Sequence, residues 1–448
     1  MRLAGALETT AFVVPSEFEG LRRHIDPAWI EEALTATGFA SLRRRRLPAD
    51  QVIWLILGMA LMRSESVARI ATMLNLVMPS GKATNALAPS ALVQARQRLG
   101  DEPLEYLFRL TGRTWGDRSA NAHRWRGLAL YGVDGTTIRV PDTAENWASF
   151  GGQAGNGTRA GSAYPTVRAV ALMALRSHVL AAASFGPYST GEVTLAADLW
   201  DSLPDNALVV MDRNFSAARD LHRISTSGSN RHWLIRLKKD VKLKRIEKLG
   251  DKDQIVELTV SRKMHSRAPG LPNALRMREI RYRKPGFRES RLITSLVDPK
   301  RFPAEEIVAL YHERWELELG FDEIKTHQLA REEAIRSKTP AGVRQELWGV
   351  AVAYNLVRVE MERAAAAVGV EPTRISFVNA LSLIRTSWIV WSTAPLAPGR
   401  IPEHLLDLRR HLGHLLLPER RSERRYPRVV KIKMSNYGKK WVRRPRAN

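Results

Sequence analysis

The sequence predicts an α/β protein in which a strand-rich middle region is flanked by two mostly helical regions. Three observations predict this. Apolar residues recur at helical spacing before about residue 120. Short apolar runs bounded by turn-forming residues, typical of strands, follow over residues 125–335, and helical spacing returns over residues 336–416. Because 448 residues exceed the usual size of one compact core, two or three domains are expected.

The chain is strongly basic. Its formal charge of +24 and pI near 10.7 predict a polyanionic partner, with nucleic acid as the first candidate and an anionic membrane as the second. The longest apolar run, Val52–Met62, is shorter than the roughly 20 residues that span a bilayer, and residues 1–15 contain no secretory signal, so no membrane partner is expected. The absence of cysteine excludes disulfides, thiolate metal sites and cysteine nucleophiles, and it suits a cytoplasmic location.

The first 120 residues predict a helical DNA-binding domain. Its clearest helical segments are Ala49–Met62, Ser66–Leu76 and Ser90–Leu99. The third segment carries Gln94, Arg96, Gln97 and Arg98, which are residue types that reach base edges and phosphates, so the arrangement is similar to a helix-turn-helix. A long connector over residues 79–89 is atypical of that motif. The alternative is a small helical bundle with a solvated basic face.

The middle region contains three strands, a helix and a fourth strand in that order. The expected elements are Leu128–Val133, Thr166–Leu175, Val179–Phe185, the helix Thr190–Leu203 and Ala207–Met211. This order predicts a ribonuclease H-like sheet over residues 125–335, in which the first and fourth strands are neighbours. A further helix and the apolar stretch Trp233–Leu237 follow. Three runs rich in Val, Ile and Thr then predict a β-rich insertion at about residues 240–300: Gln254–Ser261, Leu275–Arg283 and Glu289–Val297.

Two aspartates directly follow apolar strands. Asp134 follows Val133, and Asp212 follows Met211. A carboxylate at a strand end is held by a rigid scaffold and is open to a ligand, although an aspartate there is also a common turn former or helix cap. Because the two aspartates lie on the first and fourth strands, we expect them to lie side by side.

A third carboxylate is expected on a long helix over residues 304–327. On a helical wheel, Tyr311, Arg314, Glu318 and Lys325 share one stripe, beside an apolar stripe that would anchor the helix: Leu310, Leu317, Phe321 and Ile324. Asp322 lies near the polar stripe, so geometry alone does not choose between it and Glu318. Arg314 and Glu318 could also form a simple surface ion pair.

These residues match a known signature. The spacing Tyr311-x2-Arg314-x3-Glu318-x6-Lys325 resembles that of the insertion-sequence-four family of DDE transposases. The segments around Asp134 and Asp212 resemble the family's two aspartate motifs, and Leu21–Leu76 resembles its amino-terminal domain. The family often has glycine where this chain has Asn214, which leaves the local turn open.

The resemblance implies a DNA transposase that cleaves transposon ends and joins the 3′-hydroxyls to target DNA. It implies that Asp134, Asp212 and Glu318 bind two Mg²⁺ or Mn²⁺ ions, which suits the preference of such ions for oxygen ligands, and it selects Glu318 over Asp322. Arg314 and Lys325 would hold phosphates of the DNA, with a further contact from the Tyr311 hydroxyl. A homodimer pairing two terminal inverted repeats, in a cytoplasmic and nucleoid-associated protein, is also implied.

Several alternatives stay open. A ribonuclease H-superfamily nuclease or integrase would share the site, and a DNA-binding regulator could have lost catalysis. Trp315 could stack on a flipped base or pack under the helix. The glycine-rich stretch at residues 151–157 precedes a strand and lacks Gly-Lys-Ser/Thr, so it does not predict a nucleotide loop. Residues 336–416 are expected to be helical, and residues 417–448 form a basic tail containing Tyr426, Tyr437 and Trp441 that is expected to bind polyanions.

Overall fold

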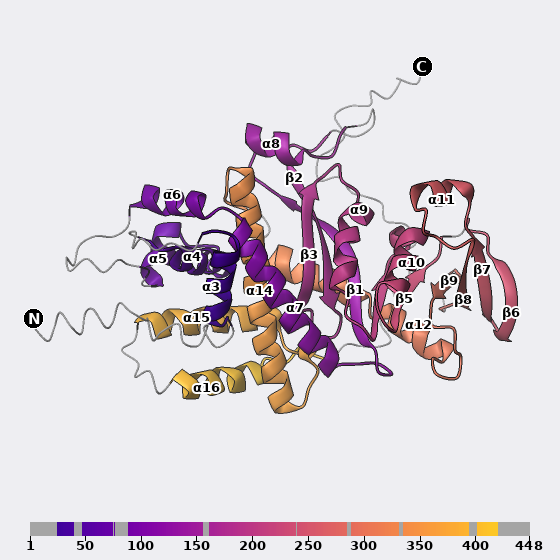
Figure 1. Ribbon diagram of the computed structural model, residues 1–448. Helices are drawn as coiled ribbons and strands as arrows, with labels where there is room; N and C mark the ends of the chain where they lie inside the picture. The colour runs from indigo at the N-terminus through magenta and orange to yellow at the C-terminus, as the bar shows by residue number, and fades with distance from the viewer. Residues whose placement is uncertain are drawn as a thin grey trace, which may run out of the picture.

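A computed structural model describes residues 25–39, 47–74, 76, 88–155, 161–238, 240–284, 288–330, 335–393 and 401–419. The elements form a helical layer at one end, a central sheet, and an extension of that sheet at the other end (Figure 1). The arginine run at residues 43–46 and the basic tail from residue 420 onward lie outside the described residues. In the part of the chain that is described, no helix is long and apolar enough to cross a membrane.

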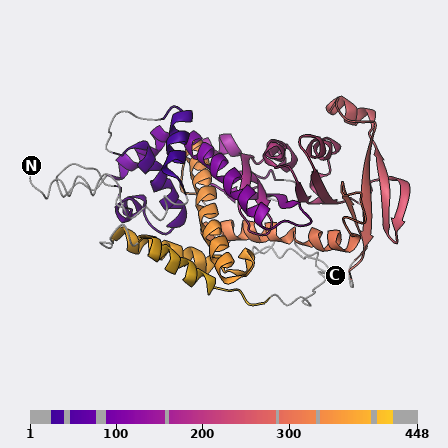
Figure 2. The ribbon, with the colours of Figure 1, turned by 60° about the horizontal axis from the view of Figure 1, so that its bottom comes forward.

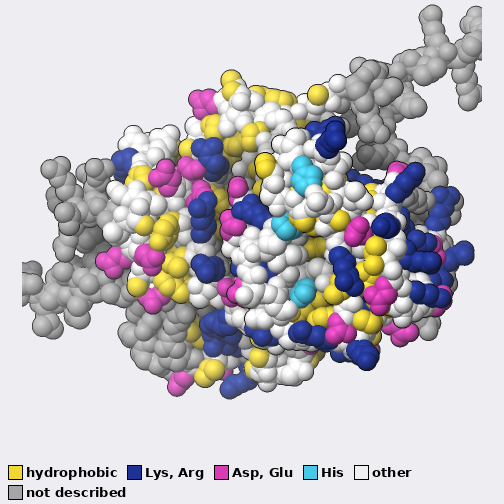
Figure 3. Space-filling model, turned by 45° about the vertical axis from the view of Figure 1, so that its right-hand side comes forward, with side chains coloured by type: hydrophobic (Ala, Val, Ile, Leu, Met, Phe, Trp, Pro, Cys, Tyr) yellow, Lys and Arg dark blue, Asp and Glu magenta, His cyan; other side chains and the backbone are white. Residues whose placement is uncertain are grey.

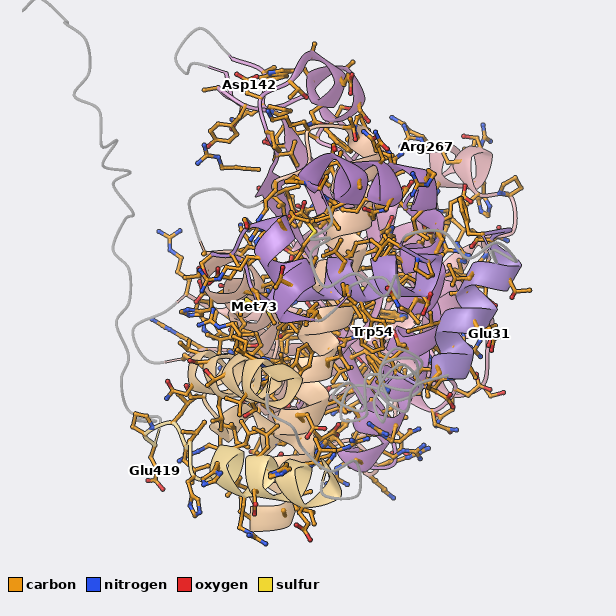
Figure 4. All side chains as sticks on the ribbon, turned by 90° about the vertical axis from the view of Figure 1, so that its left-hand side faces the viewer. Glu31, Trp54, Met73, Asp142, Arg267 and Glu419 are labelled. Atoms are coloured by element: carbon orange, nitrogen blue, oxygen red, sulfur yellow. The ribbon has the colours of Figure 1, made fainter. Side chains whose placement is uncertain are left out.

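The helical layer is built around one helix, α4 (Ala49–Leu61), that is buried over most of its length. Its helices are α3 (Pro27–Ala36), α4 (Ala49–Leu61), α5 (Val67–Met73), α6 (Pro89–Leu99) and α7 (Glu102–Ala122). Every residue of α4 from Val52 to Leu61 is buried, which explains its continuous apolar sequence. In Figure 4, Trp54 of α4 lies among the helices, whereas the exposed Glu31 of α3 lies at the outer side. The Ser66 side chain caps α5 by accepting a hydrogen bond from the Arg69 N–H.

The central sheet confirms the predicted neighbours. Its first five strands are β1 (Ala129–Arg139), β2 (Thr166–Ala174), β3 (Leu180–Pro187), β4 (Ala207–Met211) and β5 (Arg231–Arg236). They lie in the order β3-β2-β1-β4-β5, with β1 parallel to β4 and antiparallel to β2. The connections contain short helices: α8 (Ala144–Phe150), α9 (Glu192–Ala196), the 3₁₀ turns η2 (Ala197–Ser202) and η3 (Arg213–Phe215), and α10 (Ala218–Thr226).

The β-rich insertion continues the same sheet. It contains β6 (Lys244–Gly250), β7 (Asp253–Thr259), β8 (Ala274–Tyr282), β9 (Ser290–Thr294) and the short helix α11 (Arg262–Arg267). Strand β9 pairs with β5, so the sheet has nine strands ending at β6. Inside the insertion, the guanidinium of Arg278 donates two hydrogen bonds to the carboxylate of Asp253 (2.8 and 2.6 Å). Basic side chains gather over this end of the molecule (Figure 3), including those of Lys244, Arg245 and Lys248 on β6.

The sequence predicts one continuous helix over residues 304–327, and this prediction is wrong. The segment forms α12 (Ala304–His312), α13 (Trp315–Asp322) and a π-helical turn η4 (Glu323–Gln328). Between α12 and α13, the Glu313 and Arg314 N–H groups donate to carbonyls three residues earlier, which tightens the turn there. In η4, the buried carboxylate of Glu323 accepts a hydrogen bond from the hydroxyl of Tyr354 on α14 (Pro340–Val368) (2.7 Å). A helical wheel shows one helix at a time and so cannot predict this contact.

The C-terminal helices are α14 (Pro340–Val368), α15 (Phe377–Thr393) and α16 (Ile401–Gly413), with a 3₁₀ turn η5 (Pro372–Arg374). Helix α14 packs against α4, α7 and α16 and contacts β3. Figure 2 shows it running between the N-terminal helices and the rest of the molecule. At its N-terminal end, the fully buried carboxylate of Glu346 pairs with Arg63 and accepts from the Ser337 hydroxyl (2.8 Å) and the Arg336 backbone N–H (3.2 Å). A charge cluster therefore joins α14 to the segment that follows α4.

Candidate active site

Asp134 and Asp212 lie side by side on neighbouring parallel strands. The last residue pair between β1 and β4 is Val133 with Met211, so each aspartate comes one residue beyond that pair. At a strand spacing of about 4.8 Å, both carboxylates can reach one small ligand. Strand β1 does not end at Val133, as the apolar run predicted, because it continues to Arg139 in antiparallel pairing with β2.

The Asp134 carboxylate is largely buried and has both acidic and basic neighbours. Its side chain is 21% exposed, and Oδ1 accepts a hydrogen bond from the Gly135 N–H (2.8 Å). The pKa of Asp134 is raised to about 6, mainly by burial and to a smaller extent by the charges of Asp212 and Glu192, against the lowering effects of the Gly135 N–H and Arg314. A group of acidic oxygens that disfavour one another's charge fits a bound cation.

Arg314 joins the third carboxylate to the first. Its Nη1 lies 3.3 Å from Oδ2 of Asp134, and its Nη2 lies 2.9 Å from Oε1 of Glu318. Arg314 and Glu318 therefore form the ion pair that their spacing allowed. The same guanidinium also contacts Asp134, so the pair is not a simple surface pair. Asp322 does not join this group, because its carboxylate is exposed and accepts from the Thr326 hydroxyl (2.5 Å).

The turn after the second aspartate is ordered without glycine. Asp212 Oδ1 accepts a hydrogen bond from the Asn214 N–H (2.6 Å) and so caps the short turn η3. The carboxylate acts as a cap and also lies beside Asp134, so the two interpretations of this aspartate do not exclude each other. Asn214 itself is exposed, which explains why a side chain is accommodated there.

The other residues of the signature differ in how far they are buried. Tyr311 is largely buried, and burial raises the pKa of its hydroxyl to about 12. The Lys325 Nζ donates to the Thr136 hydroxyl (3.1 Å), and burial lowers the pKa of this lysine. Trp315 is 51% exposed, so the alternative of a tryptophan packed under the helix is wrong. The four predicted anchors on this segment, Leu310, Leu317, Phe321 and Ile324, are all buried as expected.

The three acidic side chains do not form a ready-made metal cage. Within the described residues, no group of three or more His, Asp or Glu side chains is arranged to hold a metal ion. At this site the Arg314 guanidinium lies between Asp134 and Glu318 and contacts both carboxylates. The structure thus brings Asp134 and Asp212 together directly and brings Glu318 to them through Arg314.

Comparisons with known proteins identify the family. Residues 126–356 match the family described as "Transposase DDE domain", and residues 15–109 match "Insertion element 4 transposase N-terminal". The chain belongs to the DDE transposases of the insertion element 4 type. The transposase InsG for insertion sequence element IS4 of Escherichia coli (strain K12) is 39% identical over 415 residues, which are 92% of each chain.

Other similar proteins are also transposases. The putative transposase InsZ of the same organism is 36% identical over 233 residues, covering 52% of this chain and 76% of InsZ. A solved structure of the piggyBac transposase synaptic complex with hairpin DNA aligns over 90% of this chain and 86% of that chain, with a TM-score of 0.45 and 9% identity. The family match and the likeness to InsG make the chain a DNA transposase with a ribonuclease H-like catalytic region, and its family depends on a divalent metal.

Two charged side chains near the transposase's acidic group were not predicted from the sequence. Glu192 begins α9 and lies so close to Gly135 that a Cβ on this glycine would be 2.5 Å from the Glu192 Cδ. Arg236 ends β5, the parallel neighbour of β4, and its charge acts on Tyr311. The sequence signal for Arg236 is its position at the end of a strand, where a cation can face the site as well as a carboxylate.

Arg96, one of the residues predicted to contact DNA, points into the protein. The Arg96 side chain is turned toward α14, where its Nε donates to Gln345 (3.1 Å) and its Nη2 to Ser337 (2.8 Å). It therefore holds α6 to α14 and does not present its guanidinium to a DNA groove. Gln94, Gln97 and Arg98 are exposed on the same helix. Of the four residues named on this helix, these three remain available for contact with DNA.

A glycine lets α13 approach the sheet closely. A Cβ on Gly132 of β1 would lie 2.8 Å from Leu317 Cδ1 of α13 and 2.7 Å from Leu175 Cδ2. We expect Gly132→Val to reduce the free energy of unfolding by about 1–3 kcal/mol, because overpacking displaces side chains in a dense core. It should also lower the strand-cleavage rate, because Glu318 lies on the displaced helix.

Gly270→Val is the matched control. No heavy atom lies within 4 Å of a Cβ at Gly270, so this variant should unfold at the same urea concentration as the unaltered protein and cleave DNA at the same rate. Equal stability of the Gly132 and Gly270 variants in urea denaturation would contradict the close packing of α13 on β1.

Proposed function

We propose that Asp134, Asp212 and Glu318 hold two Mg²⁺ or Mn²⁺ ions in this transposase. The observation that carries the proposal is the register of β1 and β4, which sets Asp134 and Asp212 next to each other, with Glu318 joined to them by Arg314. Such ions, when bound, activate an attacking water or 3′-hydroxyl and stabilise the leaving oxygen at phosphorus. The all-oxygen donor set supports this choice of metal.

The remaining residues of the signature would bind and orient DNA. Arg314 and Lys325 are cations beside the acidic group and would hold phosphates next to the cleaved bond. The Tyr311 hydroxyl remains protonated at neutral pH and can donate a hydrogen bond to a phosphate oxygen. The exposed ring of Trp315 would stack on an unpaired base.

The proposed organisation assigns DNA binding to residues 1–120, catalysis to residues 125–335 with the insertion at about 240–300, and supporting roles to the helical region 336–416 and the basic tail 417–448. The chain would act as a homodimer on two terminal inverted repeats and a target DNA, in the cytoplasm and associated with the nucleoid. The net charge of +24 supports the polyanionic partner.

The test uses the purified full chain and labelled DNA carrying the inverted repeats that flank its reading frame. With Mg²⁺ and a supercoiled target plasmid, we expect cleaved ends and strand-transfer products, and with EDTA we expect neither. Cleavage without strand transfer would favour the nuclease alternative. Binding without any cleavage in Mg²⁺ or Mn²⁺ would favour the DNA-binding regulator.

A further inference from the structure

The turn between β2 and β3 contacts the segment that carries the signature at three carboxylates. Arg176 in this turn donates from Nε and from Nη2 to the two carboxylate oxygens of Glu313 (2.9 Å each), at the junction of α12 and α13. The ring of His178 lies between two more, with Nε2 3.0 Å from Oε2 of Glu316 and Nδ1 3.3 Å from Oε2 of Glu323. We call these five side chains the turn cluster.

The carboxylates of the turn cluster lie next to the residues of the signature in the sequence. Glu316 comes two residues before Glu318, and Glu323 comes two residues before Lys325. Two residues correspond to about 200° around a helix, so Glu318 and Lys325 lie on the side of the segment opposite to the turn. The carboxylate residue at the junction directly precedes Arg314. The turn therefore holds the back of the segment whose front faces the acidic group.

The ring of His178 is held rigidly. Its side chain is 2% exposed, and its backbone N–H donates to the Ala174 carbonyl (2.8 Å). Its φ of 63° is in the left-handed region, which is uncommon for a residue other than glycine and persists where the surrounding structure fixes it. On the other side of the ring, the carboxylate of Glu323 is also fixed by the Tyr354 hydroxyl of α14 (2.7 Å). The ring is therefore a fixed support and not a mobile surface group.

The helix that carries Glu318 needs such a support. Helix α13 has eight residues, with a tight turn before it and the π-helical turn η4 after it. A helix of this length is not stable in water without tertiary contacts. On the sheet side, its Leu317 packs closely on Gly132 of β1. This apolar contact sets the height of α13 above the sheet, and the polar contacts of the turn cluster restrain its rotation and its position along the sheet.

We propose that Arg176 and His178 are positioning residues for the transposase reaction, which set the places of Glu318 and Lys325 without contacting DNA or metal themselves. The proposal rests on the proposed function, because it requires that Glu318 binds a metal ion. Residues that orient a metal ligand affect metal affinity or activity by about 10- to 100-fold when they are replaced. Because the turn cluster acts on Glu318 through the helix backbone, we expect an effect at the lower end of this range.

The test measures metal binding apart from catalysis. Each protein is bound to a terminal-repeat duplex whose cleaved end lacks the 3′-hydroxyl, so that no reaction occurs, and its unfolding temperature is followed as Mn²⁺ is added. A bound ion raises this temperature above each protein's own value without metal, so a loss of stability alone does not alter the response. Arg176→Ala and His178→Ala should each need roughly tenfold more Mn²⁺ than the unaltered protein for the same rise.

Arg126→Ala is the matched control. Arg126 also pairs with a carboxylate of the same segment, that of Glu306 in the first turn of α12, and its side chain is 36% exposed, against 31% for Arg176. Because Glu306 is twelve residues before Glu318, this variant should respond to Mn²⁺ within about twofold of the unaltered protein.

A double variant tests whether Arg176 acts through its partner. If it does, Arg176→Ala combined with Glu313→Ala should need no more Mn²⁺ than the more affected single variant, because both replacements remove the same contact. Losses that add up would show that the two residues act independently and would contradict the proposed route. Arg176 is one-third exposed, so its replacement decides the question even if His178→Ala does not fold.

The outcomes distinguish the two proposals. If Arg176→Ala responds to Mn²⁺ as the unaltered protein does, or no differently from Arg126→Ala, the turn does not position Glu318, while the response of the unaltered protein still supports the proposed metal site. If Asp212→Asn responds as strongly as the unaltered protein, or if neither responds, the metal site itself is wrong, and the positioning role fails with it.

Discussion

Replacing Asp212 by Asn is expected to abolish strand cleavage while leaving the binding of terminal-repeat DNA within about twofold. Asparagine keeps the shape of the side chain, and its amide oxygen can still accept the Asn214 N–H that closes the turn after β4. The variant loses one negative charge from the pair formed with Asp134. The cleavage rate should fall by roughly a thousandfold or more, because a metal held by fewer charged oxygens stabilises the reacting phosphate poorly. Gel assays with Mg²⁺ measure both quantities.

Asp322→Asn is the control for this prediction. Asp322 lies four residues after Glu318 and is exposed, but its carboxylate bonds to Thr326 and does not face Asp134. This variant should cleave within about twofold of the unaltered rate. Full cleavage by the Asp212 variant would disprove the metal assignment. Loss of cleavage by the Asp322 variant would show that Asp322, and not Glu318, is the third carboxylate.

Glu346→Ala is expected to produce the largest loss of stability, about 3–5 kcal/mol in the free energy of unfolding. The Glu346 carboxylate is fully buried and compensates the buried charge of Arg63, and its charge also acts on Arg96 and Arg336. Removing it leaves buried guanidinium groups without their counter-charge, which is more destabilising than the intact pair is stabilising. Urea denaturation followed by circular dichroism measures the change.

Asp407→Ala provides the comparison for Glu346→Ala. Asp407 forms an ion pair with Arg410 (2.9 Å), but both side chains are more than half exposed. Water screens such a pair, so the loss should stay below about 1 kcal/mol. Similar losses for the two variants would show that the cluster around Glu346 is solvated and does not hold α14 to the N-terminal helices.

The sequence predicted the parts of this transposase that follow from local patterns. The order of apolar runs predicted that Asp134 and Asp212 follow adjacent strands. Because residues that follow neighbouring parallel strands lie at the same edge of the sheet, the two aspartates were expected side by side. The apolar stripe predicted the burial of Leu317 and its neighbours on the helix over the sheet. Both patterns depend on periodicity alone, which a single sequence contains.

Features that depend on distant partners were not predictable. The π-helical turn after Asp322 is fixed by Glu323, whose pKa is lowered by Arg358 and His178 in spite of the opposing effect of burial. Arg96 appeared exposed on its own helix, but residues about 240 positions later bury it. The deciding contacts join residues 35 to 249 positions apart in the sequence, and a helical wheel or a motif includes only neighbours.

Helix α14 completes the core of the N-terminal helices from the other end of the chain. Close to 280 residues separate Leu61, where α4 ends, from Pro340, where α14 begins. At about 5–20 residues per second, a ribosome needs roughly 15–55 s to make that stretch. During this interval α4 can pack against α3, α5 and α6, but the side that contacts α14 in the finished fold has no partner. The first part of the protein to be synthesised is therefore among the last to become rigid, and its assembly waits for nearly the whole polypeptide.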